Sequence, residues 1–235
     1  MKYSNAEIIY KNSRANKYFA RKLLEWSKNN VRKFPWREDN SPYEIFIAEV
    51  LLKRTTSTAV SKLYRNFLSK FPTIFILFNS SLEEIKASIK PLGLYKQRAN
   101  GLKKASQKII ENFNGKIPDK YEDLMSIPNI GEYSSRAILS FGFNKTEIII
   151  DSNVRRIICR VIGNSKYWQC KDEEIKNYLK DIIPNKEHIL FNWGLLDLGS
   201  LLCSYKYEKC FSCPLKEICN FYKKKQMSKT SVIKY

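Results

Sequence analysis

The chain has 235 residues, which is long enough for a full hydrophobic core in one or two domains. Lys and Arg number 42 against 23 Asp and Glu, so the formal charge is +19. Such an excess disfavours the compact state by self-repulsion and predicts an acidic partner, first of all nucleic acid, although a lysine-rich composition alone would also produce it. No run of about 18 apolar residues and no signal peptide is present, so we expect no transmembrane helix and an intracellular protein.

Helical patterns follow one another along the first half of the chain. Residues 4–30 carry apolar side chains at helical spacing, and Asn29 and Asn30 interrupt the pattern. Residues 34–37 predict an extended aromatic connector, because the residue before a proline avoids the α region. Further helices are expected over 56–70, 73–78, 82–90 and 97–113, and the third of these has a capping box of Ser81 and Glu84 and ends at Pro91. No useful strand-type alternation occurs, so the predicted fold class is all-α.

One helix, opened by Ser41 and Pro42, is apolar on nearly every face from Tyr43 to Leu52. Glu49 lies in its middle. A buried carboxylate is costly and is usually paired or functional. The alternative is an ordinary i,i+4 ion pair between Glu49 and Lys53.

Residues 120–160 form the stretch around which the chain is organised. The order is a helix ended by Pro128, a tight turn containing Asn129 and Gly131, a second helix, the apolar run 148–150, and then Asp151 before a third helix. Both Asn and Gly tolerate the positive φ that a tight turn needs. Backbone N–H groups at such a hairpin suit a phosphate, and the helix dipole would keep Asp151 ionised. A helical hairpin followed by a simple N-cap is the structural alternative.

Four of the six cysteines lie within 17 residues, in the spacing C-x6-C-x2-C-x5-C: Cys203, Cys210, Cys213 and Cys219. Four thiolates this close suit one tetrahedral metal or one four-iron cluster, and reduced intracellular thiols are more often metal ligands than disulfides. Zinc and a disulfide pair remain alternatives. Cys159 lies beside an apolar helix stripe and is expected to be a core residue.

In this order, the Glu-bearing helix, IPNIGEYSSRAILSFGF, IIIDSNVRRI and the cysteine spacing resemble the helix-hairpin-helix/Gly-Pro-Asp, or endonuclease III, superfamily of DNA glycosylases. The resemblance runs from about Phe34 to Cys219. It implies a six-helix barrel over residues 40–145 and a [4Fe-4S] cluster domain built from residues 1–39 and 146–235. It also implies that kinked double-stranded DNA binds in the cleft between these domains with one nucleotide flipped out. One departure is Asn129, where the family usually has glycine.

The resemblance assigns a role to each candidate residue. Asp151 matches the catalytic aspartate that stabilises the sugar cation or activates water. Tyr133 stands where bifunctional members have the lysine that forms a Schiff base, so no lyase activity is expected. Glu49 would polarise the flipped base or orient water, and Tyr133 would contact a flipped pyrimidine. The [4Fe-4S] cluster would be held by the four cysteines and would position the basic loop containing Lys206 and Lys209.

Two branches of the family compete for the base that is removed. The Glu49 region is similar to adenine glycosylases, which have two glutamines in place of Lys53 and Arg54 and a C-terminal 8-oxoguanine-reading domain for which this chain leaves no room. LLKRTT together with Tyr133 is more similar to archaeal-type mismatch thymine-DNA glycosylases, which remove T or U opposite G. Arg54 can clamp a phosphate or bind guanine in two places, which glutamine cannot.

The resulting expectation is a monomeric, monofunctional repair enzyme, cytoplasmic and nucleoid-associated, with no membrane partner. An adenine glycosylase without its recognition domain and a non-catalytic DNA-binding module remain alternatives. The other candidate DNA contacts are Lys53, Thr55, Gln97, Arg98, Asn129 and Gly131, and the tail around Lys223–Lys225 is either a solvated end or a phosphate contact. For Thr55, Gln97 and Arg98 an ordinary solvated helix surface is an equal alternative.

Overall fold

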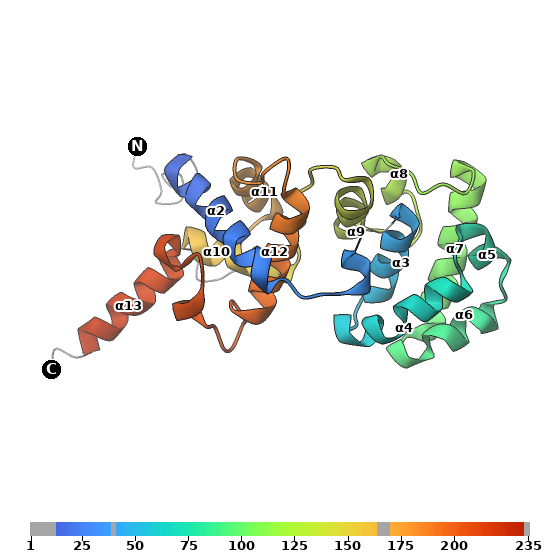
Figure 1. The fold of residues 1–235 in the computed structure, drawn as a ribbon, viewed down its shortest axis with the longest axis horizontal. Helices are drawn as coiled ribbons and strands as arrows, with labels where there is room; N and C mark the ends of the chain where they lie inside the picture. The colour runs from blue at the N-terminus through green and yellow to red at the C-terminus, as the bar shows by residue number, and fades with distance from the viewer. Residues whose placement is uncertain (1–12, 39–40, 164–169, 233–235) are drawn as a thin grey trace. The chain divides into compact units, whose positions relative to one another are not determined.

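The computed structural model describes residues 13–38, 41–163 and 170–232, and within these ranges every regular element is helical, as the sequence predicts (Figure 1). The chain divides into two compact units. Unit 1 comprises Met1–Arg32 and Ile148–Tyr235, and unit 2 comprises Lys33–Glu147. The chain therefore leaves unit 1, builds unit 2 as one continuous segment, and returns. Across the described ranges, no helix has both the length and the hydropathy that a bilayer crossing requires.

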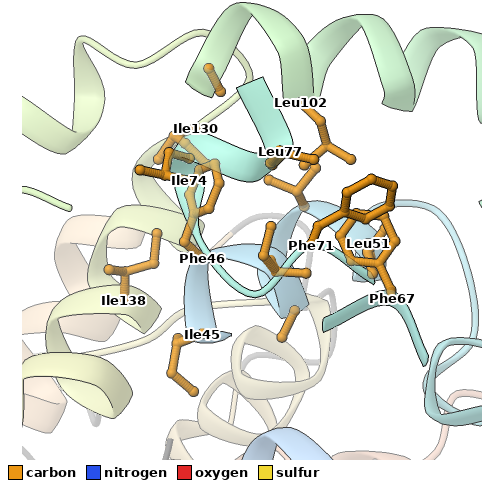
Figure 2. Packing of buried hydrophobic residues seen from close by; sticks show 14 of the residues in the cluster. Ile45, Phe46, Leu51, Phe67, Phe71, Ile74, Leu77, Leu102, Ile130 and Ile138 are labelled. Carbon is orange, nitrogen blue, oxygen red and sulfur yellow. The ribbon is translucent and has the colours of Figure 1, made fainter. Parts of the chain in front are cut away.

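Unit 2 contains helices α3 to α9. Their bounds are α3 Pro42–Leu52, α4 Ser57–Lys70, α5 Ile74–Asn79, α6 Leu82–Ile89, α7 Tyr95–Phe113, α8 Tyr121–Met125 and α9 Glu132–Ala137. A π-helical turn, η3 Ile138–Gly142, continues α9. Helix α3 is the centre of this unit, because all seven residues from Ile45 to Leu51 are buried. Figure 2 shows Ile45, Phe46 and Leu51 among apolar side chains that include Phe67 of α4, Leu77 of α5, Leu102 of α7, Ile130 of the turn before α9 and Ile138 of η3.

Polar side chains cap the first turns of α3 and α6, and both helices start where the sequence predicts. Ser41 and Glu44 form a capping box at α3, and Ser81 and Glu84 form another at α6. Each satisfies backbone N–H groups that would otherwise lack partners, which stabilises the helix by about 1 kcal/mol. The predicted end at Pro91 is displaced, because α6 passes into a 3-10 turn, η2 Lys90–Leu92, before Gly93 reverses the chain at φ 69°.

The aromatic connector is less extended than predicted. Phe34 has extended backbone angles, but residues Pro35–Arg37 form a 3-10 turn, η1. The rings of Phe34 and Trp36 stack with centroids 4.9 Å apart, and Trp36 is buried in the core of unit 2. In this turn the two stacked rings bury apolar surface against each other, which stabilises it.

Unit 1 is built from both ends of the chain. Its elements are α2 Ser13–Asn30, α10 Ser152–Ile162, α11 Asp172–Lys180, α12 His188–Leu201, η5 Cys210–Ser212, η6 Lys216–Ile218 and α13 Asn220–Val232. Helix α2 packs along α12. Gly194 of α12 permits this approach, since a Cβ there would lie 2.0 Å from the Ser27 hydroxyl. The helix predicted from residue 4 is present from Ser13, and its earlier positions, including Ile8 and Ile9, lie outside the described residues.

A buried ion pair ties the end of α2 to α12. The fully buried carboxylate of Asp197 accepts hydrogen bonds from the Arg32 backbone N–H at 2.6 Å and from the Arg32 Nη2 at 2.6 Å. A buried charge held by several donors avoids the large cost of desolvation without a partner. The contact therefore holds the last residue of the N-terminal segment of unit 1 in place.

Cys159 and Cys170 form a disulfide that the sequence analysis does not predict. Cys159 is fully buried in the apolar core of unit 1, as expected, but it is paired and not a free thiol. The expectation that intracellular cysteines outside the cluster stay reduced is therefore wrong for this pair. The sequence could not reveal it, because α11, which follows Cys170, is brought against α10 by tertiary packing.

Candidate active site

The hairpin between α8 and α9 takes the turn that the sequence predicts, with one correction. Asn129 adopts φ 65°, the left-handed conformation that asparagine tolerates. Gly131 was expected to share it but is extended, with φ −113° and ψ −177°. Gly131 is exposed, and a Cβ built on it would meet no heavy atom within 4 Å. Nothing inside the described fold therefore requires glycine at position 131.

Helix α7 makes room for this hairpin. A Cβ on Gly101 would lie 2.8 Å from the Asn129 side-chain nitrogen, so the turn rests directly against the α7 backbone. On the other side, the Lys53 ammonium donates a hydrogen bond to the Asn129 carbonyl. Lys53 and Asn129, which the sequence predicts as separate DNA contacts, thus join the end of α3 to the hairpin.

Glu49 is buried, with 5% of its surface exposed. Burial raises its pKa to about 8, while the Lys53 charge and a hydrogen bond from Ser134 act in the opposite direction. Ser134 lies on α9 and is itself buried. Burial lowers the pKa of Lys53, and its nearness to Glu49 opposes this. The geometry therefore supplies a carboxyl group able to hold a proton near neutral pH, next to the hairpin.

Asp151 caps helix α10, as the sequence predicts. Its Oδ1 accepts from the Val154 N–H at 2.7 Å, and its Oδ2 accepts from the Asn153 Nδ2 at 2.9 Å. The side chain is half-buried, and burial raises its pKa above the usual value for aspartate, although both hydrogen bonds lower it. The predicted ionising effect of the helix terminus is real but smaller than the effect of desolvation.

A buried arginine extends this arrangement. The Arg156 guanidinium donates to the Asn153 Oδ1 at 2.7 Å, to the Gly199 carbonyl at 2.8 Å and to the Cys203 carbonyl at 2.6 Å. Gly199 permits the contact, since a Cβ there would lie 2.4 Å from that of Asn153. Asp151 is therefore oriented by Asn153, which is in turn held by Arg156.

A cavity of about 420 Å³ lies wholly within unit 2, between the ends of α3 and α7 and the hairpin. Arg54, Leu94, Gln97 and Asn129 contribute to its wall. Arg54 and Leu94 both have left-handed backbone angles, with φ 51° and 47°. Such angles are unfavourable for these residue types, and strained residues gather at functional sites. Leu94 is 48% exposed beside this cavity.

The weaker candidates differ in their surroundings. Gln97 is exposed on the cavity wall, and Thr55 is half-buried in the turn after α3. Arg98 is buried, and its guanidinium donates to the carbonyls of Val50 at 3.1 Å and Leu51 at 3.0 Å, and to that of Lys53. The prediction of Arg98 as a phosphate contact is therefore wrong, and so is the alternative of a solvated surface. Its guanidinium caps the C-terminal end of α3, because it donates to carbonyls that have no hydrogen-bond partner within the helix.

Tyr133 is half-buried in the first turn of α9, one residue before the Ser134 that bonds Glu49. Glu49, Tyr133 and the hairpin therefore share unit 2, whereas Asp151 and its partners belong to unit 1. Four further residues of these surroundings are not predicted from the sequence: Leu94, Ser134, Asn153 and Arg156. Two of them have a signal in the sequence, because Asn153 follows Asp151 by two residues and Leu94 follows Gly93. No sequence pattern indicates what their side chains contact.

The four clustered cysteines are free thiols in one stretch of unit 1. Burial raises the pKa of Cys213 to about 12 and that of Cys219 to about 11, and neighbouring cysteines of the set also raise both. Arg160 donates to the Cys203 sulfur at 3.2 Å. Within the described ranges no three His, Cys, Asp or Glu side chains are gathered into a metal-binding group. The donor set fits a four-iron cluster in its chemistry, although the thiols would have to converge to hold it.

Comparison with known proteins places these residues in a family. The model for HhH-GPD superfamily base excision DNA repair proteins matches residues 47–185. A thymine/uracil-DNA glycosylase of Pyrobaculum aerophilum is 36% identical over 87% of this chain and 91% of its own length. An adenine DNA glycosylase of Buchnera aphidicola subsp. Schizaphis graminum is 37% identical over 90% of this chain, but over 61% of its own length.

Solved structures agree with this assignment. The structure of a thermostable thymine-DNA glycosylase superposes with a TM-score of 0.84 at 29% identity, covering 90% of this chain and 98% of its own. Endonuclease III in a non-covalent DNA complex superposes with a TM-score of 0.78 at 24% identity. The match covers 96% of this chain and 100% of endonuclease III, which shows a shared fold. The predicted all-α, endonuclease III-like fold is therefore confirmed, and the chain belongs to the HhH-GPD superfamily of base excision DNA repair proteins.

Proposed function

We propose that this chain is a monofunctional DNA glycosylase that acts as a monomer on double-stranded DNA and removes thymine or uracil opposite guanine. The observation that carries the proposal is the 36% identity to a thymine/uracil-DNA glycosylase over 91% of that protein's length. The side chains described above support the chemistry.

Asp151 is the proposed partner of the sugar. Cleavage of the glycosidic bond builds positive charge on the ribose ring, and a carboxylate held in a fixed orientation stabilises that charge or accepts a proton from the attacking water. The hydrogen bonds from Val154 and Asn153 support this role, because they restrict both carboxylate oxygens. Asn153 is a positioning residue in this proposal, and Arg156 acts through it.

Glu49 is the proposed proton donor toward the base. Its pKa of about 8, raised by burial, keeps it protonated near neutral pH, which an ordinary glutamic acid is not. Hydrogen bonding to Ser134 would hold the carboxyl group toward α9 and Tyr133. Donation to the departing base would lower the negative charge that the base carries as the bond breaks.

Tyr133 supports a monofunctional reaction. A phenol cannot form a Schiff base with the sugar, so the strand would remain intact after base removal. We expect no covalent adduct when the protein is mixed with substrate and borohydride, with endonuclease III as the positive control. A trapped adduct at this chain would contradict the assignment of Tyr133.

The cavity of unit 2 is the proposed site of contact with the strand opposite the flipped nucleotide. Leu94 is suited to act as an apolar wedge that separates two base steps, and Arg54 to bind the unpaired guanine or a phosphate. Gln97, Thr55 and Lys53 would contact the backbone beside it. The hairpin at Asn129 and Gly131 would receive a phosphate on its N–H groups.

The four cysteines would hold a [4Fe-4S] cluster that ties the end of the chain to the rest of unit 1 and carries the loop with Lys206 and Lys209. The cluster would supply a rigid anchor and local charge. A broad absorption band near ~400 nm in the purified protein tests this, since zinc gives none. Colourless protein with stoichiometric zinc would contradict it.

A panel of duplexes tests the function: T·G, U·G, A·G, A·8-oxoG and 5-methylcytosine·G, each followed by alkali cleavage. We expect release of T and U opposite G. Adenine removal is the second candidate, because the Buchnera adenine glycosylase is equally similar in identity. Release of A and not T would establish that candidate instead. Tight binding with no release from any duplex would indicate a non-catalytic DNA-binding module.

A further inference from the structure

The segment between the first two clustered cysteines carries an aromatic surface for which the proposed reaction has no role. Tyr205 is 59% exposed and Tyr207 is 81% exposed, with the exposed Lys206 between them. We call residues 204–209 the tyrosine loop. Large exposed aromatic rings, set close together beside a charge, are typical of binding surfaces.

The backbone of the tyrosine loop is held in place at several points. The Arg160 guanidinium donates to the Ser204 carbonyl at 2.9 Å, and the Tyr207 N–H donates to the Ser204 hydroxyl at 3.0 Å. The Lys209 N–H donates to the Leu202 carbonyl at 2.8 Å. A loop that is already ordered loses little conformational entropy on binding. The rings of Tyr205 and Tyr207 are therefore pre-organised for a partner.

Charge indicates the kind of partner. Glu208 is the one acidic residue of the tyrosine loop, and its carboxylate accepts a hydrogen bond from Lys225 of α13, so its charge is paired. Lys206 and Lys209 remain exposed, so the surface around the two rings is positive. A polyanion with flat apolar faces matches both features, and single-stranded nucleic acid is such a partner.

We propose that the tyrosine loop binds single-stranded DNA, with Tyr205 and Tyr207 stacking on unpaired bases and Lys206 contacting phosphate. In a duplex the bases already stack on one another, so the rings would distinguish strands with unpaired bases from intact helix. This site is separate from the base-removal chemistry, and its test needs no glycosylase activity.

The test is fluorescence anisotropy of a labelled oligo(dT) strand with purified protein that shows its absorption band near ~400 nm. Tyr205→Ala/Tyr207→Ala should weaken binding at least about fivefold, the lower bound for loss of one base–aromatic stack. The slope of log K against log salt should stay unchanged, because no charge is removed. Tyr205→Phe/Tyr207→Phe should restore binding, since phenylalanine stacks equally well.

Two variants serve as controls. Phe75→Ala removes a similarly exposed ring, 50% exposed, from α5 in unit 2 and should leave binding unchanged. Lys206→Ala should reduce the salt slope by about one. If the double alanine variant loses the band, Tyr205→Leu/Tyr207→Leu takes its place, because leucine keeps apolar bulk without a ring. Unchanged affinity, failure of the phenylalanine pair to restore binding, or an equal loss in Phe75→Ala would overturn the proposal.

Discussion

At the scale of single residues, Asp151 and Glu49 are both carboxyl groups whose surroundings set their protonation. Desolvation raises the pKa of each, but Asp151 accepts two hydrogen bonds that favour its charged form. Glu49 is more deeply buried, and its pKa rises to about 8. Glu49 therefore holds a proton near neutral pH more readily than an ordinary glutamic acid does, whereas the hydrogen bonds to Asp151 favour its charged form.

We expect Asp151→Asn to slow base release on the order of 10²–10³-fold, because the amide keeps the cap but loses the negative charge. Duplex binding should change less than about threefold, since the substitution removes no phosphate contact. Single-turnover cleavage at saturating protein measures the first quantity and anisotropy the second. Full activity in this variant would remove Asp151 from the mechanism.

Gly131 offers a residue-scale test of the phosphate site. Its extended φ suits any residue and its Cβ position is open, so Gly131→Ala should change the free energy of unfolding by less than about 0.5 kcal/mol. Duplex binding should nevertheless weaken at least about fivefold, because the methyl group would displace an approaching phosphate from the hairpin N–H groups.

Asn129→Gly is the matched control for that experiment. Glycine adopts the positive φ of Asn129 without strain, so binding should be retained. Wild-type affinity in Gly131→Ala would show that no phosphate lies against this residue.

At the scale of elements, helix α10 presents Asp151 through a chain of hydrogen bonds. Arg156→Lys keeps the charge but cannot reach Asn153, Gly199 and Cys203 together. We expect unfolding to become easier by about 1–3 kcal/mol and base release to slow about tenfold at a temperature where the variant is folded. The losses from Arg156→Lys and Asn153→Ala should be less than additive in single-turnover rates. Strict additivity would mean that Arg156 does not act through Asn153.

Helix α3 makes stability depend on pH through Glu49. Its pKa is raised from 4.5 to about 8, so between these values the folded protein binds more protons than the unfolded chain. Stability should therefore fall as pH rises through this window, by up to about 1.4 kcal/mol per pH unit. Urea unfolding of wild type and Glu49→Gln at pH 5.5 and 7.5 measures this. The variant should show a smaller fall, and equal falls would contradict the shifted pKa.

At the scale of the whole molecule, the +19 charge governs encounter with DNA. We expect log K for duplex binding to fall linearly with log salt. Lys206→Ala/Lys209→Ala should reduce the magnitude of the slope by about two, with the cleavage rate at saturation unchanged. An unaltered slope would place the tyrosine loop away from duplex phosphates.

Several features could be predicted from residues alone because they depend on local pattern. The apolar run of α3 predicted its burial, Ser41-Pro42 and the capping box of Ser81 and Glu84 predicted helix starts, and Asp151 was predicted as an N-cap. The order of hairpin, aspartate and cysteines predicted the family. Each of these signals lies within a few turns of chain or in the order of such segments.

What the sequence determined by itself was the all-α class, the positions of most helices and the chemical types available for a glycosylase site. Tertiary structure decided which of those groups are free to act. Arg98 is occupied by α3 carbonyls, Asp151 is held through Asn153 and Arg156, and Cys159 is joined to Cys170. The physical reason is that desolvation and hydrogen-bond partners depend on residues distant in the chain, and local patterns carry no information about them.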